Sequence, residues 1–391
     1  MALKYVSEYR DSQLAKVLIE SIKEKIEALH SSGSIKAKKR LRLMEVCGTH
    51  TMSIFRHGIR SVLPDTIELL SGPGCPVCVT AQKDIDAFIE LSKQDNVILT
   101  TFGDLMKVPG TFSSLQKEKA DGRDIRVVYS VFDAVEIAAA NQGVTCNCNQ
   151  ANSANKTNQA KEVVFCGVGF ETTTPTVAAS ILMASERGID NFSIHSAHKL
   201  TPPALAALME TPATQIDGFI LPGHVSVITG VDGYKEVFDK YKVPSVIAGF
   251  EPLDILKAIL MLVTQQISGL PALENGYERA VSQFGNVKAV QIMNQVFEPA
   301  DSVWRGIGHI PESGMKLRDS YKSFDALKKF NLELKDTPEP VGCACGQILM
   351  GLKTPEQCMM YGKKCTPAHP VGPCMVSSEG SCAAYYRYKG L

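Results

Sequence analysis

Residues 41–78 decide the fold class, and they read LRLMEVCGTHTMSIFRHGIRSVLPDTIELLSGPGCPVC. Two short apolar runs, 41–46 and 66–70, have the length of buried strands, and residues 52–62 between them have helical spacing. A strand, a helix and a second strand in this order are typical of a βαβ unit with parallel strands. The stretch therefore predicts an α/β protein.

The same alternation extends over most of the chain. A first helix is expected at 10–30, where apolar residues recur with helical spacing and SSGS follows. Further strands are expected at 97–101, 126–130, 163–168, 192–195, 218–221 and 245–248. Further helices are expected at 81–92, 131–141, 176–187, 203–210 and 253–266.

Changes in composition predict the domain boundaries. Residues 142–161 are rich in Asn, Gln, Ser and Thr, which is typical of a linker or inserted loop, and they include Cys146 and Cys148. After about residue 300, Gly, Pro and Cys crowd together. We therefore expect two similar parallel-sheet α/β domains and a small cysteine-rich iron–sulfur domain. The predicted units are a helical segment at 1–40, an α/β domain at 41–141, the insert at 142–161, a second α/β domain at 162–300 and the iron–sulfur domain at 301–391.

Composition excludes several classes of function. The 391 residues carry 41 basic and 41 acidic side chains, which argues against a strongly basic nucleic-acid or membrane-surface binder. No apolar run reaches the ~18 residues of a membrane span. The N-terminus, MALKYVSEYRD, lacks the apolar core of a secretory signal, so a cytoplasmic protein is expected. In that compartment, 12 cysteines indicate metal binding or redox chemistry rather than a disulfide scaffold.

Half of the cysteines lie near the C-terminus: Cys343, Cys345, Cys358, Cys365, Cys374 and Cys382. Zinc sites usually have paired cysteines two to four residues apart, and this tail does not have that spacing. Wide spacing suits an iron–sulfur cluster, whose thiolate ligands come from different loops. Spacing alone favours a cluster over zinc, and some of the six can equally be buried cysteines without a ligand.

Cysteines also follow the first two predicted strands. Cys47 and His50 lie in a turn before a helix, where Cys47 can be a nucleophile, a soft metal ligand or simply a buried residue. Cys75 and Cys78 form a C-x-x-C after the second strand, a spacing that allows a reversible disulfide or half of a metal site. Parallel strands end at one edge of a sheet, so a single shared site is expected.

The second half of the chain offers weaker signals. Residues 167–172 begin like a dinucleotide fingerprint, but Thr172 replaces its third glycine, which argues against nucleotide binding. Three histidines lie at or near predicted strand ends: His195, His198 and His224. Each alone is more often a hydrogen-bonded structural group than a ligand.

Taken together, the motifs resemble the hydrogenase maturation factor HypD family. The resemblance runs from about residue 40 to the C-terminus and rests on motifs in family order: EVCGTH (45–50), GPGCPVC (72–78), FGDLMKVPG (102–110), GFETTTP (169–175) and MVSSEGSCAAYY (375–386). The polar insert at 142–161 departs from the pattern, and no family role is assigned to it.

The resemblance implies a scaffold on which the Fe(CN)₂CO unit of [NiFe]-hydrogenase is assembled, together with a HypC-type small chaperone and a HypE-type cyanide donor. It implies two α/β domains and a domain with a [4Fe-4S] cluster. The family's cluster motif, C-x₁₄-C-x₆-C-x₁₆-C, falls on Cys343, Cys358, Cys365 and Cys382. Cys374 then lies outside the ligand set, and Cys345 stands as the alternative to Cys343.

The chemistry of these residue types agrees with the implied role. Low-spin Fe(II) prefers soft donors, so Cys47 can supply one thiolate and the chaperone another, with His50 orienting the site. Cys75 and Cys78 can cycle between dithiol and disulfide, with electrons relayed by the cluster. A cluster passes one electron and a disulfide takes two, so two transfers or a cluster-bound thiyl stage are needed.

Two other functions compete with this one. The chain can be an iron–sulfur thiol/disulfide oxidoreductase that acts on a small molecule through Cys75 and Cys78, or a nucleotide-dependent enzyme that uses residues 167–172. A diffusible substrate would be turned over by the isolated protein, whereas a scaffold would bind iron, cyanide and CO stoichiometrically and only with partners. Infrared bands of metal-bound cyanide and CO discriminate between these functions.

Overall fold

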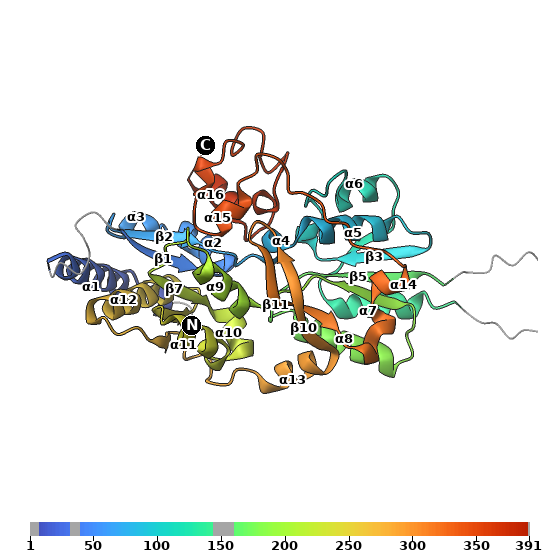
Figure 1. Ribbon diagram of the computed structural model, residues 1–391, viewed down its shortest axis with the longest axis horizontal. Helices are drawn as coiled ribbons and strands as arrows, with labels where there is room; N and C mark the ends of the chain where they lie inside the picture. The colour runs from blue at the N-terminus through green and yellow to red at the C-terminus, as the bar shows by residue number, and fades with distance from the viewer. Residues whose placement is uncertain (1–7, 32–39, 144–159, 390–391) are drawn as a thin grey trace, which may run out of the picture.

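Two parallel β-sheets lie at opposite ends of the long axis of the molecule (Figure 1). The computed structural model describes residues 8–31, 40–143 and 160–389, so most of the predicted insert, with Cys146 and Cys148, lies outside the described residues. The first sheet has the order β2-β1-β7-β8-β9 and consists of β1 (Leu41–Glu45), β2 (Ile67–Ser71), β7 (Gly218–Pro222), β8 (Ser245–Ala248) and β9 (Leu273–Asn275). The second has the order β4-β3-β5-β6 and consists of β3 (Val97–Thr101), β4 (Ile125–Val127), β5 (Glu162–Gly167) and β6 (Phe192–Ser196).

The strand pairing corrects the predicted domain boundaries. β1 pairs in parallel with both β2 and β7, with Met44 opposite Leu70 on one side and Phe219 on the other. The first sheet therefore combines an early and a late part of the chain, and the second sheet is built from the part between them. Residues 41–141 and 162–300 are not separate units. Apolar periodicity locates buried strands but does not say which strands pair.

Helices cover both faces of each sheet, as in other α/β proteins. In the first sheet, α1 (Ser12–Ser31) packs on α12 (Pro252–Ser268), and their apolar residues share one core with β1 and β8. In the second, α7 (Val131–Ala140) and α8 (Thr174–Glu186) cover one face. The remaining helices around the sheets are α2 (Gly48–Arg56), α3 (Ile59–Val62), α4 (Pro76–Val79), α5 (Gln82–Ser92), α6 (Leu115–Ala120), α9 (Thr201–Glu210), α10 (Gly223–Thr229), α11 (Lys235–Tyr241) and α13 (Val287–Val296). Within the described residues, no helix is both long and apolar enough to cross a membrane.

The predicted helix at 52–62 begins earlier and is interrupted. Cys47 has extended backbone angles and serves as the N-cap of α2, which therefore starts at Gly48. The chain then turns at Gly58, whose φ of 63° is left-handed and favours glycine. As a result, Cys47 lies directly before α2 and His50 lies in its first turn.

An antiparallel hairpin lies between the two sheets (Figure 1). It is formed by β10 (Phe297–Trp304) and β11 (Gly308–Leu317), which the sequence did not predict. Trp304 forms a bridge to Thr80, and Gly314 forms one to Lys199, so the hairpin touches the segments that leave both sheets. This position corrects the expectation that residues from 301 onward belong to a separate iron–sulfur domain.

The cysteine-rich segment follows the hairpin and α14 (Ala326–Lys329). Its short helices are α15 (Cys345–Leu349) and α16 (Ser381–Tyr388), with 3₁₀ turns at Pro355–Gln357 and Pro373–Met375. It packs on α2 and α4, and its buried side chains belong to the same apolar core as those of both sheets. The structure therefore does not set this segment apart as a domain with a core of its own.

Candidate functional site

The turns after β1 and β2 touch each other. The amide of Gly48 donates a hydrogen bond of 3.0 Å to the carbonyl of Gly74. A side chain at Gly74 would place its Cβ 2.2 Å from the backbone nitrogen of Cys47, so only glycine fits. The turn that carries Cys47 and the turn that carries Cys75 and Cys78 therefore lie together at the carboxyl edge of one sheet, as expected from neighbouring parallel strands.

Cys47 is a buried thiol at the start of α2, with 8% of its surface exposed. Burial, and next the nearby carboxylate of Glu379, raise its pKa to about 12, although the amides of His50 and Thr49 favour the thiolate. The helix N-terminus alone therefore does not produce a thiolate here. Cys47 is held as a neutral thiol that must lose its proton to bind a metal ion.

His50 lies behind Cys47 and is completely buried. Its Nε2 lies 3.2 Å from the carbonyl oxygen of Ala248 and 3.0 Å from that of Gly249, so Nε2 carries the proton and donates. Nδ1 has no hydrogen-bond partner among the residues that the structure describes, and burial lowers the pKa of the ring to about 4. The ring stacks on Phe250 at 4.7 Å, and Phe250 in turn stacks on the exposed His224. His50 is thus a neutral, oriented imidazole with a free acceptor.

Two carboxyl groups that sequence reasoning did not assign also surround Cys47. Glu45 is fully buried, accepts hydrogen bonds from the Thr51 hydroxyl and the Cys47 amide, and burial raises its pKa to about 8. Glu379 comes from the cysteine-rich segment, and its Oε1 accepts a 2.6 Å hydrogen bond from Thr49. Both lie inside motifs quoted above, so their positions in those motifs were the available signal.

Cys75 and Cys78 form a disulfide across the single turn of α4. Their Cα atoms are 5.2 Å apart, and the Cys78 amide donates to Cys75 Sγ at 3.2 Å. Both residues are buried, with 3% and 0% of their surface exposed. Ser377 Oγ lies 3.1 Å from Cys75 Sγ, so the cysteine-rich segment covers this bond as it covers Cys47.

The C-terminal cysteines gather around one small apolar cavity. Its walls include Cys343, Cys345, Cys358, Cys365 and Cys382. The Cys345 thiol interacts with those of Cys343, Cys374 and Cys382, and this contact lowers the pKa of Cys343 to about 7 and raises that of Cys345. Gly372 closes the cavity, since a Cβ there would lie 2.5 Å from Cys345 Sγ. The structure places the four predicted ligands and Cys345 on the wall of this cavity, whereas Cys374 contacts Cys345 and is not part of the wall.

We refer to these six cysteines as the cysteine cage. In the described part of the chain, no three His, Cys, Asp or Glu side chains converge on a single point as a metal ion requires. Five of the six cysteines, all except Cys374, instead line the wall of a cavity, and the Val371 amide donates to Cys365 Sγ at 3.3 Å. A thiol-rich, apolar wall with amide donors fits an iron–sulfur cluster in its chemistry.

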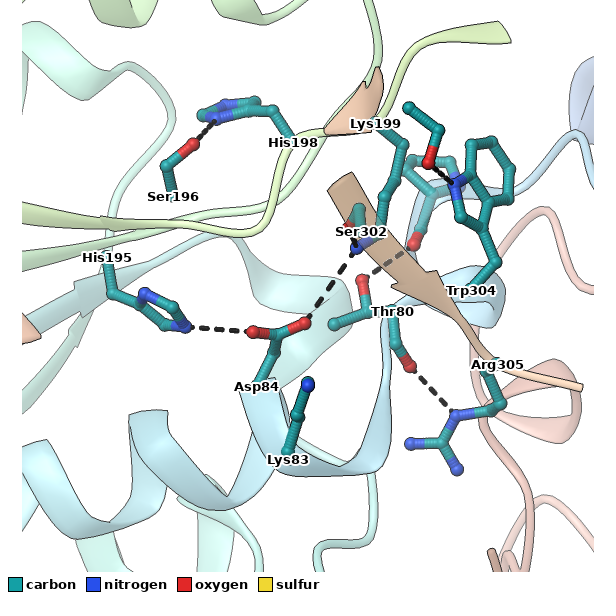
Figure 2. A network of polar contacts seen from close by, with 12 residues as sticks. Thr80, Lys83, Asp84, His195, Ser196, His198, Lys199, Ser302, Trp304 and Arg305 are labelled. Atoms are coloured by element: carbon teal, nitrogen blue, oxygen red, sulfur yellow. Dashed lines mark hydrogen bonds and ion pairs between the residues drawn. The ribbon is translucent and has the colours of Figure 1, made fainter. Parts of the chain in front are cut away.

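The residues predicted near the second sheet form a separate polar network. Figure 2 shows Asp84 between His195, 3.1 Å from one carboxylate oxygen, and Lys199, 3.9 Å from the other. His198 is bound by Ser196 at 3.0 Å, and burial lowers its pKa to about 3. His195 and His198 therefore belong to this network and do not join Cys47, whereas His224 lies near the Cys47 site through its stacking on Phe250.

The side chains of the glycine turn after β5 also make contacts within the protein. Glu171 accepts hydrogen bonds from the amide and hydroxyl of Thr201, at 2.7 and 2.9 Å. A Cβ at Gly169 would lie 2.5 Å from that of Thr173. The carboxylate of Glu171 therefore joins the turn after β5 to the first residue of α9.

The fold and the site define a class of α/β protein in which cysteine turns, rather than a phosphate-binding loop, occupy the carboxyl edge of a parallel sheet. Comparison with known proteins gives the family. The family model "HypD: Hydrogenase formation hypA family" matches residues 15–147 and 143–389. The chain belongs to the HypD family.

Characterised relatives match along nearly their whole length. The hydrogenase maturation factor HypD of Rhodobacter capsulatus is 42% identical over 393 residues, which cover 99% of both chains. That of Azotobacter vinelandii is 42% identical over 99% of this chain and 97% of its own. That of Escherichia coli K12 is 40% identical over 99% and 98%. The resemblance drawn from the motifs is thus confirmed.

Proposed function

We propose that the protein is a maturation factor for [NiFe]-hydrogenase and acts in the cytoplasm as the scaffold on which the Fe(CN)₂CO unit is assembled. The observation that carries this proposal is the contact of one short loop with two cysteine sites. Ser377 reaches Cys75, and Glu379 reaches the turn of Cys47, from the segment that also holds the cysteine cage. These two contacts join the turn of Cys47, the Cys75–Cys78 disulfide and the cysteine cage, which are far apart in the sequence.

Each site has a distinct role in this proposal. Cys47 loses its proton and binds the cargo iron, together with a cysteine of a HypC-type chaperone, and His50 fixes the surrounding turn. The Cys75–Cys78 disulfide accepts two electrons and two protons and becomes a dithiol. The electrons come from an external low-potential one-electron donor. A HypE-type partner delivers the cyanide groups.

The cysteine cage would hold a [4Fe-4S] cluster through Cys343, Cys358, Cys365 and Cys382. Such a cluster supplies one-electron transfer when bound. The burial of the disulfide under Ser377 supports internal electron transfer, because a diffusible disulfide substrate would need direct access to the sulfur atoms. This observation favours the scaffold over an oxidoreductase that acts on a small molecule.

The test is infrared spectroscopy of the protein purified without oxygen together with its chaperone and cyanide-donor partners. The parent complex should show bands of metal-bound cyanide and CO. Cys47→Ala should remove these bands and leave the visible absorption of the cluster unchanged, because the two metal sites use different residues. Undiminished cyanide bands in Cys47→Ala would contradict the role of Cys47. Turnover of a small disulfide by the isolated chain would favour the oxidoreductase instead.

A further inference from the structure

Arg305 is a buried cation at the tip of the hairpin. Only 2% of its surface is exposed. Its amide donates to the Val79 carbonyl at 2.8 Å, and its Nε donates to the Thr80 carbonyl at 2.9 Å. Figure 2 shows this second bond, with the guanidinium set apart from the Asp84 network. Arg305 is therefore anchored to the end of α4, the helix that carries the disulfide.

One end of this guanidinium has no partner. Nη2 is buried and makes no hydrogen bond within the described residues. A buried donor without an acceptor is costly, and more so on a charged group. Such a group in a native structure indicates a missing anion or acceptor.

The cysteine cage lies beside this unpartnered group. Arg305 lies close enough to Cys343 and Cys374 for its positive charge to interact with both residues. The next residue, Gly306, packs directly on Gly346, which follows Cys345 of the cage, since a Cβ on Gly306 would lie 2.0 Å from the Gly346 Cα. The hairpin tip thus holds a fixed cation between the disulfide helix and the cage.

We propose that Arg305 is the counter-charge of the cysteine cage, a positioning residue that stabilises the reduced state of the cluster held there. This inference rests on the proposed function, because it requires the cluster. Four thiolates give such a cluster a net negative charge, and one-electron reduction adds another. A fixed cation nearby therefore favours the reduced form and raises the reduction potential.

The experiment uses the full chain, reconstituted without oxygen, as parent, Arg305→Gln and Arg305→Lys. Arg318→Gln is the matched control, because Arg318 directly follows β11 of the hairpin and its neighbour is Glu298, 3.2 Å away, rather than a thiol. Iron and sulfide are measured first, and each cluster is then titrated with dithionite against redox mediators while visible absorption is followed.

Arg305→Gln should bind as much iron and sulfide as the parent. Its equilibrium constant for one-electron reduction should be about tenfold smaller, which corresponds to a potential about 59 mV more negative. Arg305→Lys should lie closer to the parent, and Arg318→Gln should match it. An unchanged potential in Arg305→Gln would overturn the inference.

Two further outcomes are also decisive. If Arg305→Gln binds no cluster but Arg305→Lys does, and both have the parent's circular dichroism, the need for a positive charge is supported. If both variants lose the cluster and unfold, Arg305 has only a structural role and the inference is overturned. A parent chain that binds no iron or sulfide would instead refute the cluster in the proposed function.

Discussion

The side chains around Cys47 show how burial sets the charge of single residues. At neutral pH the Cys47 thiol, the His50 ring and the Glu45 carboxyl are predominantly uncharged, because burial shifts their pKa values to about 12, 4 and 8. An uncharged pocket does not attract cations in general. It can nevertheless bind a soft metal ion once the thiol loses its proton.

Gly74 is the residue at which this arrangement is most sensitive to substitution. Gly74→Ala would push a methyl group into the backbone of Cys47, so the two turns would have to move apart. We expect a loss of roughly 1–3 kcal/mol in the free energy of unfolding, measured by chemical denaturation. Gly103→Ala is the control, since its Cβ would meet no atom closer than 3.7 Å. Equal stability of the two variants would contradict the close approach.

At the scale of elements, the C-terminal segment has little regular secondary structure of its own. Its helices are short: α15 has five residues and α16 has eight. Isolated helices of this length are not stable in water. Packing on α2 and α4 supplies part of the missing free energy, and metal binding would supply more.

Serine substitution of single cage cysteines identifies the ligands. We expect Cys343→Ser, Cys358→Ser, Cys365→Ser and Cys382→Ser each to lose most of the bound iron and the visible absorption, because each removes a thiolate ligand. Cys345→Ser and Cys374→Ser should retain both. Iron and sulfide analysis of anaerobically reconstituted protein provides the measurement. Loss of iron in Cys345→Ser together with retention of iron in Cys343→Ser would show that Cys345, and not Cys343, is the ligand. Zinc alone in every preparation would rule out the cluster.

The disulfide in α4 is expected to be reversible. Its two cysteines are separated by two residues, and the turn that joins them is short, as in redox-active pairs. Differential alkylation and mass spectrometry should show Cys75 and Cys78 blocked after oxidation and both alkylated after reduction and unfolding. Cys166, which is fully buried and forms no disulfide within the described part of the chain, provides an internal control. Identical alkylation of Cys75 and Cys78 in both states would contradict the redox role.

At the scale of the whole molecule, the two sheets are tied together by the path of the chain. The first sheet needs β1 and β2 from before the second sheet and β7 to β9 from after it. The hairpin and the cysteine-rich segment then pack across both. The first sheet therefore cannot form from one continuous part of the sequence, whereas the second sheet is built from residues 97–196 alone.

This topology predicts cooperative unfolding. The single tryptophan, Trp304, is buried in the hairpin between the sheets and donates from Nε1 to Ser313 Oγ at 2.9 Å. Urea unfolding of the metal-free protein followed by Trp304 fluorescence should coincide with unfolding followed by far-ultraviolet circular dichroism. A fluorescence transition at clearly lower urea would show that the hairpin detaches first.

The sequence by itself determined the class of fold, most of the parallel strands and the family. Local apolar runs indicate buried strands. For this reason, residues 97–101 and 245–248 were predicted with the same bounds as β3 and β8. Motif residues likewise identified the family, and neighbouring parallel strands were enough to bring Cys47 near Cys75 and Cys78.

Only the tertiary structure decided which strands pair, where the hairpin lies and which charged groups face the thiols. Nothing in the local sequence of β1 indicates that it pairs with β7. Pairing between distant strands depends on packing and not on the pattern of either strand. Glu379 and Arg305 reach the cysteine sites from loops and hairpin tips that carry no periodicity. Their roles depend on burial and distance, and both arise only when the chain is folded.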